Sequence, residues 1–442
     1  MRDKKDKPWK AEYREKLVSA DEAVSHIRSG QRIVFSNAAG ESLVLSDALV
    51  RNRALFENVE IVHMVAMGEA KYCEPGMEKH FRHNSFFLGA STRKAAKEGR
   101  ADVTPVYFSE VTELFRTTLP VDAVFLNLSP PDEHGYCSFG ISVDYSKPAA
   151  MEAELVIAQI NPSMPRTLGD SFIHISDIDY IVEADTPLIE LPPAGISEVE
   201  RAIGKNCASL IEDGDTLQLG IGAIPDAVLG FLKEKKDLGI HSEMISDGIV
   251  ELYEGGVITN RRKSLHAGKS IVTFLMGTRK LYDFADNNPA VELHPVDYVN
   301  DPYVIAQNER LVSVNSCVQV DLMGQIVSAS VGRRQISGVG GQVDFVRGAN
   351  MSRGGKSIMA MPSTAAEGRI SKIVPVIGEG AAVTTSRYDA DYIVTEYGAA
   401  RLKGESLRNR SKMLIRIAHP DFRRMLAEEY EKRFREAWSD DE

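Results

Sequence analysis

The residues best placed to do chemistry are a glutamate and a glycine loop in the second half of the chain. Glu243 stands 21 positions after Gly222, the second glycine of the segment Gly220–Pro225. A glycine-rich loop between a strand and a helix, and a carboxylate at the end of the next strand, meet at the edge of an open α/β sheet where ligands bind. A carboxylate there can act as a general base, a metal ligand or a nucleophile. The pair predicts a ligand site and leaves its chemistry open.

The glycine loop has both a functional and a structural explanation. Gly220 and Gly222 let the backbone approach a ligand closely, and the free N–H groups of the helix that follows can bind an anion. Pro225 suits the first turn of that helix, where its missing N–H costs nothing. A tight strand-to-helix turn with no ligand would have the same sequence, so the loop alone does not decide.

The spacing between the glycine loop and Glu243 is also typical of a dinucleotide-binding fingerprint. That motif needs a third glycine, and an acidic residue about 20 positions further on holds the ribose. Glu243 meets the spacing, but Pro225 and Asp226 stand where the third glycine is required. Glu243 also continues into Met244–Gly248 instead of ending its segment. Both departures disfavour this hypothesis.

A nucleophilic glutamate needs donors for the negative charge that develops on the acyl group it attacks. Backbone N–H groups of glycine loops supply such donors. The chain offers Gly220–Gly222 and a second cluster at Gly338–Gly341. His241 lies two positions from Glu243 and is expected to be a packed side chain. No His/Asp cluster with metal-ligand spacing surrounds Glu243, so we expect no metal here.

The elements that position these residues form a weak internal repeat. The segments 27–39 and 211–222 each predict the end of a helix, a glycine, a short apolar strand and a small-residue loop, with another helix following. The next strands, 61–65 and 240–243, correspond as well. Val65 then stands where the second copy has Glu243, and the first copy lacks the paired glycines. The sequence therefore predicts a duplication with its chemistry in the second copy.

A linker separates the two copies. Thr186–Gly195 contains three prolines and a glycine, which is typical of a connecting segment. Ser197 and Glu200 then predict a capping box at the start of the next helix. We expect an N-terminal α/β domain over residues 1–190 and a C-terminal α/β domain over residues 191–442, the second carrying the glutamate and the glycine loops.

Strand and helix signals alternate in both halves. Such alternation predicts α/β architecture: two similar open α/β domains with largely parallel sheets. The apolar segments expected to be strands include 122–126, 153–158, 270–275 and 391–394.

Composition narrows the class of protein. A net charge of −11 over 442 residues argues against a nucleic-acid-binding protein, which would show a basic face. No apolar run has the length of a membrane span, and the charged start Met1–Lys7 lacks the apolar core of a signal peptide. The four cysteines show no paired spacing, which indicates reduced thiols in a cytoplasmic protein. They are Cys73, Cys137, Cys207 and Cys317.

Several longer motifs extend the comparison beyond single residues. They are Gly220–Val228, His241–Met244, Gly340–Phe345 and Asp391–Gly398 in the second half, and Ser129–Tyr136 and Asn161–Asp170 in the first. In sequence and order these motifs resemble those of the acetyl-CoA hydrolase/transferase family, which contains class I CoA-transferases. The similarity covers nearly the whole chain, and it looks closest to the 4-hydroxybutyrate and butyrate CoA-transferase branch.

The resemblance implies a reaction. CoA would move between a short-chain acyl-CoA, such as 4-hydroxybutyryl-CoA or butyryl-CoA, and acetate by a ping-pong mechanism. The glutamate matching Glu243 would attack the thioester to give a mixed anhydride, and the CoA thiolate would return to form a glutamyl-CoA thioester. An acceptor carboxylate would then take up the acyl position, and CoA would leave on the new acid.

The resemblance also implies roles for other residues. The oxyanion donors would be the backbone N–H groups of Ile221 and Gly341, with Asn315 and Glu396 as supporting polar residues. The residues expected to line the CoA channel are Gly220, Gly222, Ala223, Ile224, Pro225, Gly338, Gly340 and Gln342. We expect no cofactor apart from CoA as substrate, no metal, no nucleic-acid or membrane partner, and a homodimer or higher homo-oligomer.

Two other functions remain open at this stage. An acyl-CoA hydrolase would use the same glutamate and differ only in admitting water. A non-catalytic acyl-CoA-binding protein would keep the fold without turnover. At residue level, Glu396 could simply cap the helix that follows it, and Asn315 could be a buried strand residue satisfied by the backbone.

Overall fold

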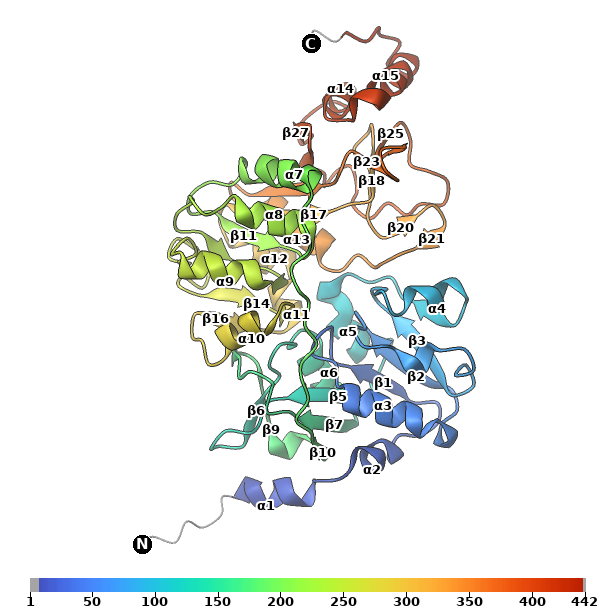
Figure 1. Ribbon diagram of the computed structural model, residues 1–442, viewed down its shortest axis with the longest axis vertical. Coiled ribbons are helices and arrows are strands. Elements are labelled where there is room, and N and C mark those ends of the chain that lie inside the picture. Colours follow the sequence, from blue (N-terminus) through green and yellow to red (C-terminus); the bar gives the residue numbers. More distant parts are fainter. Residues whose placement is uncertain (1–7, 440–442) are drawn as a thin grey trace. The chain divides into compact units, whose positions relative to one another are not determined.

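The chain folds into two compact units in a computed structural model that describes residues 8–439 (Figure 1). The first unit comprises the chain up to Leu191 together with Ile271–Val299. The second comprises Pro192–Ser270 and the chain from Asn300 onward. Each unit has its own largely parallel sheet, which confirms the predicted α/β class.

The first unit is built on a seven-stranded parallel sheet in the order β10-β7-β5-β1-β2-β3-β4. Its strands are β1 (Arg32–Phe35), β2 (Val59–His63), β3 (Phe81–Ser85), β4 (Ala101–Val103), β5 (Ala123–Leu128), β7 (Leu155–Ile160) and β10 (Tyr180–Glu183). Its helices up to Leu191 include α1 (Pro8–Glu15), α2 (Ala20–Ser25), α3 (Leu43–Arg51), α4 (Arg93–Lys97), α5 (Val111–Arg116) and α6 (Ser146–Glu152).

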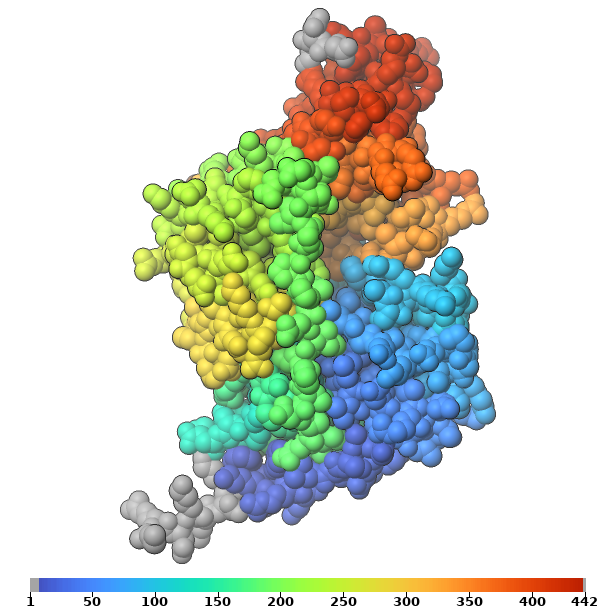
Figure 2. Space-filling view, viewed as in Figure 1, coloured from blue at the N-terminus to red at the C-terminus, as the bar shows by residue number. Residues whose placement is uncertain are grey.

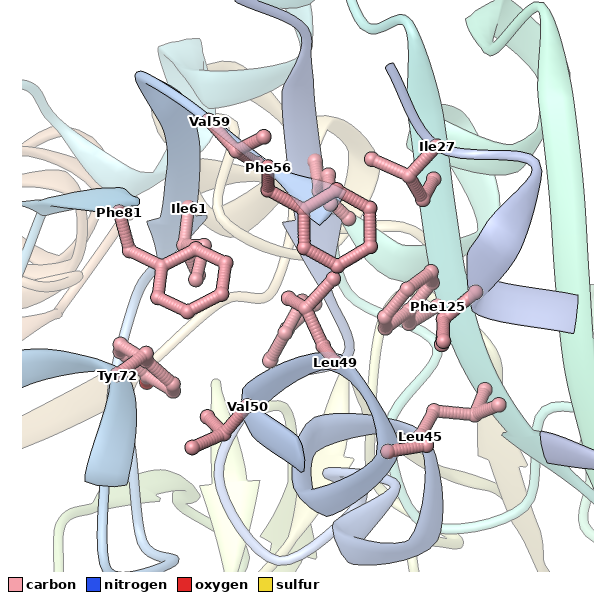
Figure 3. Close-up of a cluster of buried hydrophobic side chains, with 14 of the residues drawn as sticks. Ile27, Leu45, Leu49, Val50, Phe56, Val59, Ile61, Tyr72, Phe81 and Phe125 are labelled. Atoms are coloured by element: carbon pink, nitrogen blue, oxygen red, sulfur yellow. The ribbon is translucent and has the colours of Figure 1, made fainter. Parts of the chain in front are cut away.

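Helix α3 shows how this unit is held together. Its N-cap Ser42 accepts a hydrogen bond from the backbone of Leu45, which fixes where the helix begins. Figure 3 shows its apolar face against side chains of the sheet; the residues include Leu45, Leu49, Ile61 and Phe125. All are buried, and each such side chain contributes about 1.5–3 kcal/mol relative to exposure.

The segment Ile271–Val299 packs with the first unit, although the linker boundary places it in the C-terminal domain. Strand β16 (Val291–Leu293) pairs in parallel with β8 (Leu168–Gly169). The backbone N–H of Val143 donates to the Thr273 carbonyl at 3.2 Å. The segment also contains most of β14 (Ser270–Val272), β15 (Phe274–Leu275), α10 (Arg279–Ala285) and α11 (Val296–Val299). The expected strand 270–275 is therefore divided in two.

The second unit has a six-stranded sheet in the order β12-β11-β17-β22-β26-β27, in which only β27 runs antiparallel to its neighbour. Its strands are β11 (Thr216–Leu219), β12 (Gly239–Ile240), β17 (Leu311–Ser316), β22 (Lys356–Ala360), β26 (Tyr392–Thr395) and β27 (Gly398–Arg401). Its helices include α7 (Glu198–Ala208), α8 (Ala223–Gly230), α9 (Asp247–Glu254), α12 (Pro302–Ala306), α13 (Gln342–Met351), α14 (Leu407–Arg416) and α15 (Pro420–Phe434).

Both sheets have the same topological switch point. In the first unit, β2 lies on one side of β1 and β5 on the other; in the second, β12 and β17 flank β11 in the same way. The chain therefore crosses from strand to strand in one direction on one side of the central strand and in the opposite direction on the other. Because parallel crossovers are right-handed, the helices of these two directions lie on opposite faces of the sheet. Ligands of open α/β sheets bind at the carboxyl edge of such a point. The shared topology agrees with the predicted duplication.

The predicted linker is extended and lies on the surface, and the chain from Pro192 to Val199 is exposed (Figure 2). The capping box also forms, because the Ser197 side chain accepts from Glu200 N and the Glu200 side chain accepts from Ser197 N. No helix among residues 8–439 is long and apolar enough to cross a membrane.

Candidate active site

Glu243 lies in the short loop between β12 and β13 (Met244–Ile245), next to the carboxyl end of β11. Its buried neighbour Ser242 accepts a hydrogen bond from Leu219 N at 3.4 Å and donates to the Met244 carbonyl at 2.7 Å. Ser242 thereby holds the loop against the residue that precedes Gly220. The Glu243 side chain is itself only partly buried.

Gly341 touches the carboxylate of Glu243. It is the N-cap of α13, and a Cβ atom added there would lie 1.9 Å from Glu243 Oε2 and 2.3 Å from Asn300 Nδ2. Real Cβ atoms do not approach other atoms so closely, so a side chain here would push the Glu243 carboxylate and the Asn300 amide out of their present positions. The carboxylate consequently lies at the N-terminus of a ten-residue helix, where a negative charge is favoured.

Asn300 is the main neighbour that the sequence did not reveal. It is fully buried, and its Nδ2 donates to Glu243 Oε2 at 2.8 Å. The next residue, Asp301, caps α12 by accepting from Tyr303 N at 2.8 Å. A lone asparagine beside such a cap predicts only a helix start, and 57 positions separate it from Glu243. No signal in the sequence connected the two.

The first glycine loop is open to close approach. Gly222 has φ +106° at the N-cap of α8, a backbone conformation that favours glycine. Nothing lies within 4 Å of a Cβ position at Gly220 or Gly222, and Ile221 is 40% exposed. The side chains of Ile224 and Pro225 are buried, so these two residues could line a channel only with their backbone.

Asn315 and Glu396 form hydrogen bonds elsewhere. The Asn315 amide pairs with Gln218 on β11, with Nδ2 donating to Gln218 Oε1 at 3.1 Å. Glu396 follows β26 and accepts from Ser363, at 2.9 Å from its backbone N–H and 2.5 Å from its hydroxyl. Two strands lie between β11 and β26, a separation of about 14 Å at the usual strand spacing. The hydrogen bonds of Glu396 to Ser363 place its carboxylate at the end of β26 rather than at β11.

Lys372 adds a positive charge near Glu396. Its Nζ donates to the Cys317 carbonyl at 3.2 Å. Burial lowers the pKa of Lys372, while the nearby Cys317 and Glu396 oppose that effect. The side chains around Glu396 thus form a polar group of their own at the carboxyl ends of β17, β22 and β26.

The second glycine loop is mostly buried. Gly338 and Gly340 are both buried, and Gly340 has φ +54°. The buried Gln342 side chain donates to Thr385 Oγ1 at 2.8 Å, so its amide is used within the unit. Within the segment 338–342, Gly341 is the residue that meets Glu243.

No metal-binding arrangement accompanies the site. Among residues 8–439, no group of three or more His, Cys, Asp or Glu side chains is placed to hold a metal ion. His241 is fully buried, with its ring 6.2 Å from that of Phe345. The site thus holds a carboxylate that accepts a hydrogen bond from the Asn300 amide, at the start of a helix and beside an open glycine loop.

A carboxylate near backbone N–H groups of glycine loops could attack an acyl group, with those N–H groups receiving the charge that develops. Residues 1–191 match the model of the acetyl-CoA hydrolase/transferase N-terminal domain, and residues 277–430 match that of its C-terminal domain. The chain belongs to the acetyl-CoA hydrolase/transferase family.

Individual relatives cover the chain almost completely. The 4-hydroxybutyrate coenzyme A transferase of Clostridium kluyveri is 63% identical, over 96% of this chain and 100% of its own length. The butyryl-CoA:acetate CoA-transferase of Anaerostipes caccae is 39% identical, over 96% and 98%. The solved 4-hydroxybutyrate CoA-transferase of Porphyromonas gingivalis superposes with a TM-score of 0.84 at 45% identity, over 96% and 100%.

Proposed function

We propose that this chain is a CoA-transferase that moves CoA between a short-chain acyl-CoA, 4-hydroxybutyryl-CoA or butyryl-CoA, and acetate, with Glu243 as the nucleophile. The observation that carries the role of Glu243 is its environment. Asn300 donates to its carboxylate at 2.8 Å, and Gly341 leaves no room for a side chain against it. A carboxylate reacts with a thioester only when it is held in place and freed of competing water.

The reaction proceeds through four exchanges at carbonyl carbon. A Glu243 oxygen attacks the thioester carbon, the C–S bond breaks, and CoA thiolate leaves an acyl-glutamyl anhydride. The thiolate then attacks the glutamyl carbon, the C–O bond breaks, and the first acid leaves as a carboxylate. Acetate repeats both steps in reverse and departs as acetyl-CoA. No net proton is taken up, so the cycle requires no general acid.

Each exchange places negative charge on a carbonyl oxygen. The backbone N–H groups of Gly341 and Ile221 are the proposed donors for that charge, and donors of this kind are worth about 10²–10³ in kcat. Asn300 Nδ2 adds a side-chain donor on the glutamyl oxygen. The loop Gly220–Pro225 and the glycines at 338 and 340 are proposed to border CoA, with Asn315, Glu396 and Gln342 as supporting residues.

The trapped intermediate tests this proposal directly. The protein is incubated with butyryl-CoA alone, reduced with borohydride and digested, and the Glu243 peptide is analysed by mass spectrometry. Borohydride reduces a glutamyl-CoA thioester to a primary alcohol and releases CoA, so we expect 2-amino-5-hydroxypentanoate in place of the glutamate at position 243, and no such change in Glu243→Gln. The exposed Glu234→Gln is the matched control and should be labelled like the unchanged chain. An unmodified Glu243 peptide would exclude the mechanism.

An acyl-CoA hydrolase is the second candidate, since the family includes both activities by description. Release of free CoA is measured with and without acetate. A transferase converts acetate into acetyl-CoA with little free CoA, whereas a hydrolase releases CoA at the same rate in both conditions. A non-catalytic binding protein would show neither product, and Glu243→Ala would change its affinity only modestly.

The proposal also covers the oligomeric state, the cellular location and the need for a cofactor or metal. We propose a homodimer or higher homo-oligomer, a cytoplasmic location and no bound cofactor or metal. Light scattering of the purified chain measures the oligomeric state, and activity after EDTA treatment measures metal dependence. A monomer at assay concentration, or a loss of activity that added metal restores, would overturn the corresponding expectation.

A further inference from the structure

Asp344 shares the Asn300 amide with the proposed nucleophile. It lies in the first turn of α13, is 3% exposed, and its Oδ2 is 3.5 Å from Asn300 Nδ2. The same nitrogen donates to Glu243 Oε2 at 2.8 Å. One NH₂ group therefore faces two carboxylates, one closely and one at longer range.

This arrangement fixes which way the amide is turned. An asparagine side chain has a donor end and an acceptor end that occupy the same volume. Turning the amide over would place Oδ1, which has no hydrogen to give, against both carboxylates. Among residues 8–439 Oδ1 has no hydrogen-bond partner, so no bond on that side of the amide holds it. The two carboxylates on the Nδ2 side set its orientation.

The two carboxylates do not contribute equally throughout the reaction. Glu243 loses its negative charge when it becomes an anhydride or a thioester, and its attraction for the Asn300 NH₂ group falls. Asp344 is not acylated in the cycle, so its Oδ2 remains an acceptor for the Asn300 NH₂ group throughout. The amide donor is needed at that stage, because attack on the glutamyl carbon places negative charge on the Glu243 oxygen.

We propose that Asp344 is a positioning residue that keeps Asn300 Nδ2 turned toward Glu243 while Glu243 is acylated. The inference rests on the proposed role of Glu243 as nucleophile. Asp344 acts through Asn300 and touches no reacting atom.

A double-mutant cycle tests the inference. Asp344→Ala should lower kcat by about 10-fold, within the usual coupling of residues in one hydrogen-bond network. KM for butyryl-CoA should stay within about 2-fold, because no contact with substrate is lost. In the Asn300→Ala background, the same Asp344→Ala change should lower kcat by less than about 2-fold, since the group that Asp344 orients is gone. If the reductions in kcat of the two single variants multiply in the double variant, the inference is wrong.

A second variant separates this role from a structural one. Asp344→Asn keeps the shape of the side chain and removes its charge, so it should fold even if Asp344→Ala does not. We expect it to lower kcat by about 3-fold with an unchanged melting temperature, and to slow hydroxylamine cleavage of the isolated glutamyl-CoA thioester by a similar factor. An unchanged kcat in Asp344→Asn would count against the inference.

The two proposals fail in different ways. If the unchanged chain forms no thioester on Glu243, the nucleophile and the positioning role are both wrong. If the thioester forms normally and the Asp344 and Asn300 effects multiply, only the positioning role is wrong.

Discussion

The carboxyl edges of the two sheets hold carboxyl groups in contrasting environments. In the first unit, Asp144 is enclosed and accepts three hydrogen bonds, from Ser142 Oγ at 2.9 Å and from Ser146 N and Oγ at 3.1 Å. Burial raises the pKa of Asp144 to about 6. In the second unit, Glu243 is partly exposed and is held by Asn300 at the start of α13. Only the second arrangement combines a fixed carboxylate with open space.

Glu41 makes the contrast stronger. It is 2% exposed in the loop after β1, and its Oε2 accepts from Gly68 N at 3.0 Å. Among the residues that the structure describes, its Oε1 has no hydrogen-bond partner. Burial raises the pKa of Glu41 to about 7, so it is largely neutral in mildly acidic solution. The same topology thus encloses carboxyl groups of raised pKa in one unit and presents a partly exposed carboxylate from the other.

Removing Glu243 is expected to have the largest effect. Glu243→Gln should lower kcat at least about 10⁴-fold, as expected when a nucleophile is lost. Folding should be unaffected, since Gln can still accept from Asn300. Steady-state transfer assays and a thermal melt measure both. Substantial residual transfer in Glu243→Gln would remove the functional difference between the two edges.

Gly341→Ala should be almost as damaging. The new methyl group would meet Glu243 Oε2 at 1.9 Å, so the carboxylate or the start of α13 must move. We expect kcat to fall about 10³-fold, the upper range for a lost oxyanion donor. Gly230→Ala is the matched control, because nothing lies within 4 Å of its Cβ position. Normal activity in Gly341→Ala would show that Glu243 does not need this close contact.

Glu41→Gln should stabilise the first unit in a pH-dependent manner. The folded pKa of about 7 lies above the ordinary value of 4.5. Below pH 4.5 both the folded and the unfolded chain carry the proton. Between pH 4.5 and 7 the unfolded chain loses it while the folded chain keeps it, so the stability of the unchanged protein falls as the pH rises to 7. The free energy of unfolding of Glu41→Gln should therefore exceed that of the unchanged chain by about 3 kcal/mol at pH 8, and the two should differ little near pH 4.5.

Urea titrations at both pH values measure this gain in stability. The exposed Glu74→Gln, as control, should change the free energy by less than about 0.5 kcal/mol at either pH. A Glu41→Gln chain that is less stable than the unchanged one at pH 8 would mean that the ionised carboxylate is well accommodated, and the contrast between the two edges would disappear.

Gly222→Ala is expected to have the smallest effect. A side chain at φ +106° and ψ −178° strains the loop by about 1–3 kcal/mol, because this backbone region is essentially confined to glycine. If this loop borders CoA, KM for the acyl-CoA should rise several-fold while kcat changes little. A rise in kcat with an unchanged KM would argue against a binding role for the loop.

Much of the architecture could be predicted because it depends on local patterns. The apolar segments 122–126, 153–158 and 391–394 form β5, β7 and β26, and the linker and its capping box appear where prolines and Ser197 indicate. Ile271–Val299 could not be assigned, because its place depends on pairing with Leu168–Gly169, more than a hundred positions earlier. Strand pairing over such distances leaves no local trace.

By itself the sequence determined the α/β class, the duplication, the glycine loops and Glu243, since helix periods, turn residues and motif order are local properties of the chain. Only the tertiary structure decided which side chains surround that glutamate. It brought Asn300 and Asp344 to the site and directed the hydrogen bonds of Asn315 and Glu396 to Gln218 and Ser363. The physical reason is that hydrogen-bond partners are selected by the crossing of strands and helices far apart in sequence, and a residue type carries no information about that crossing.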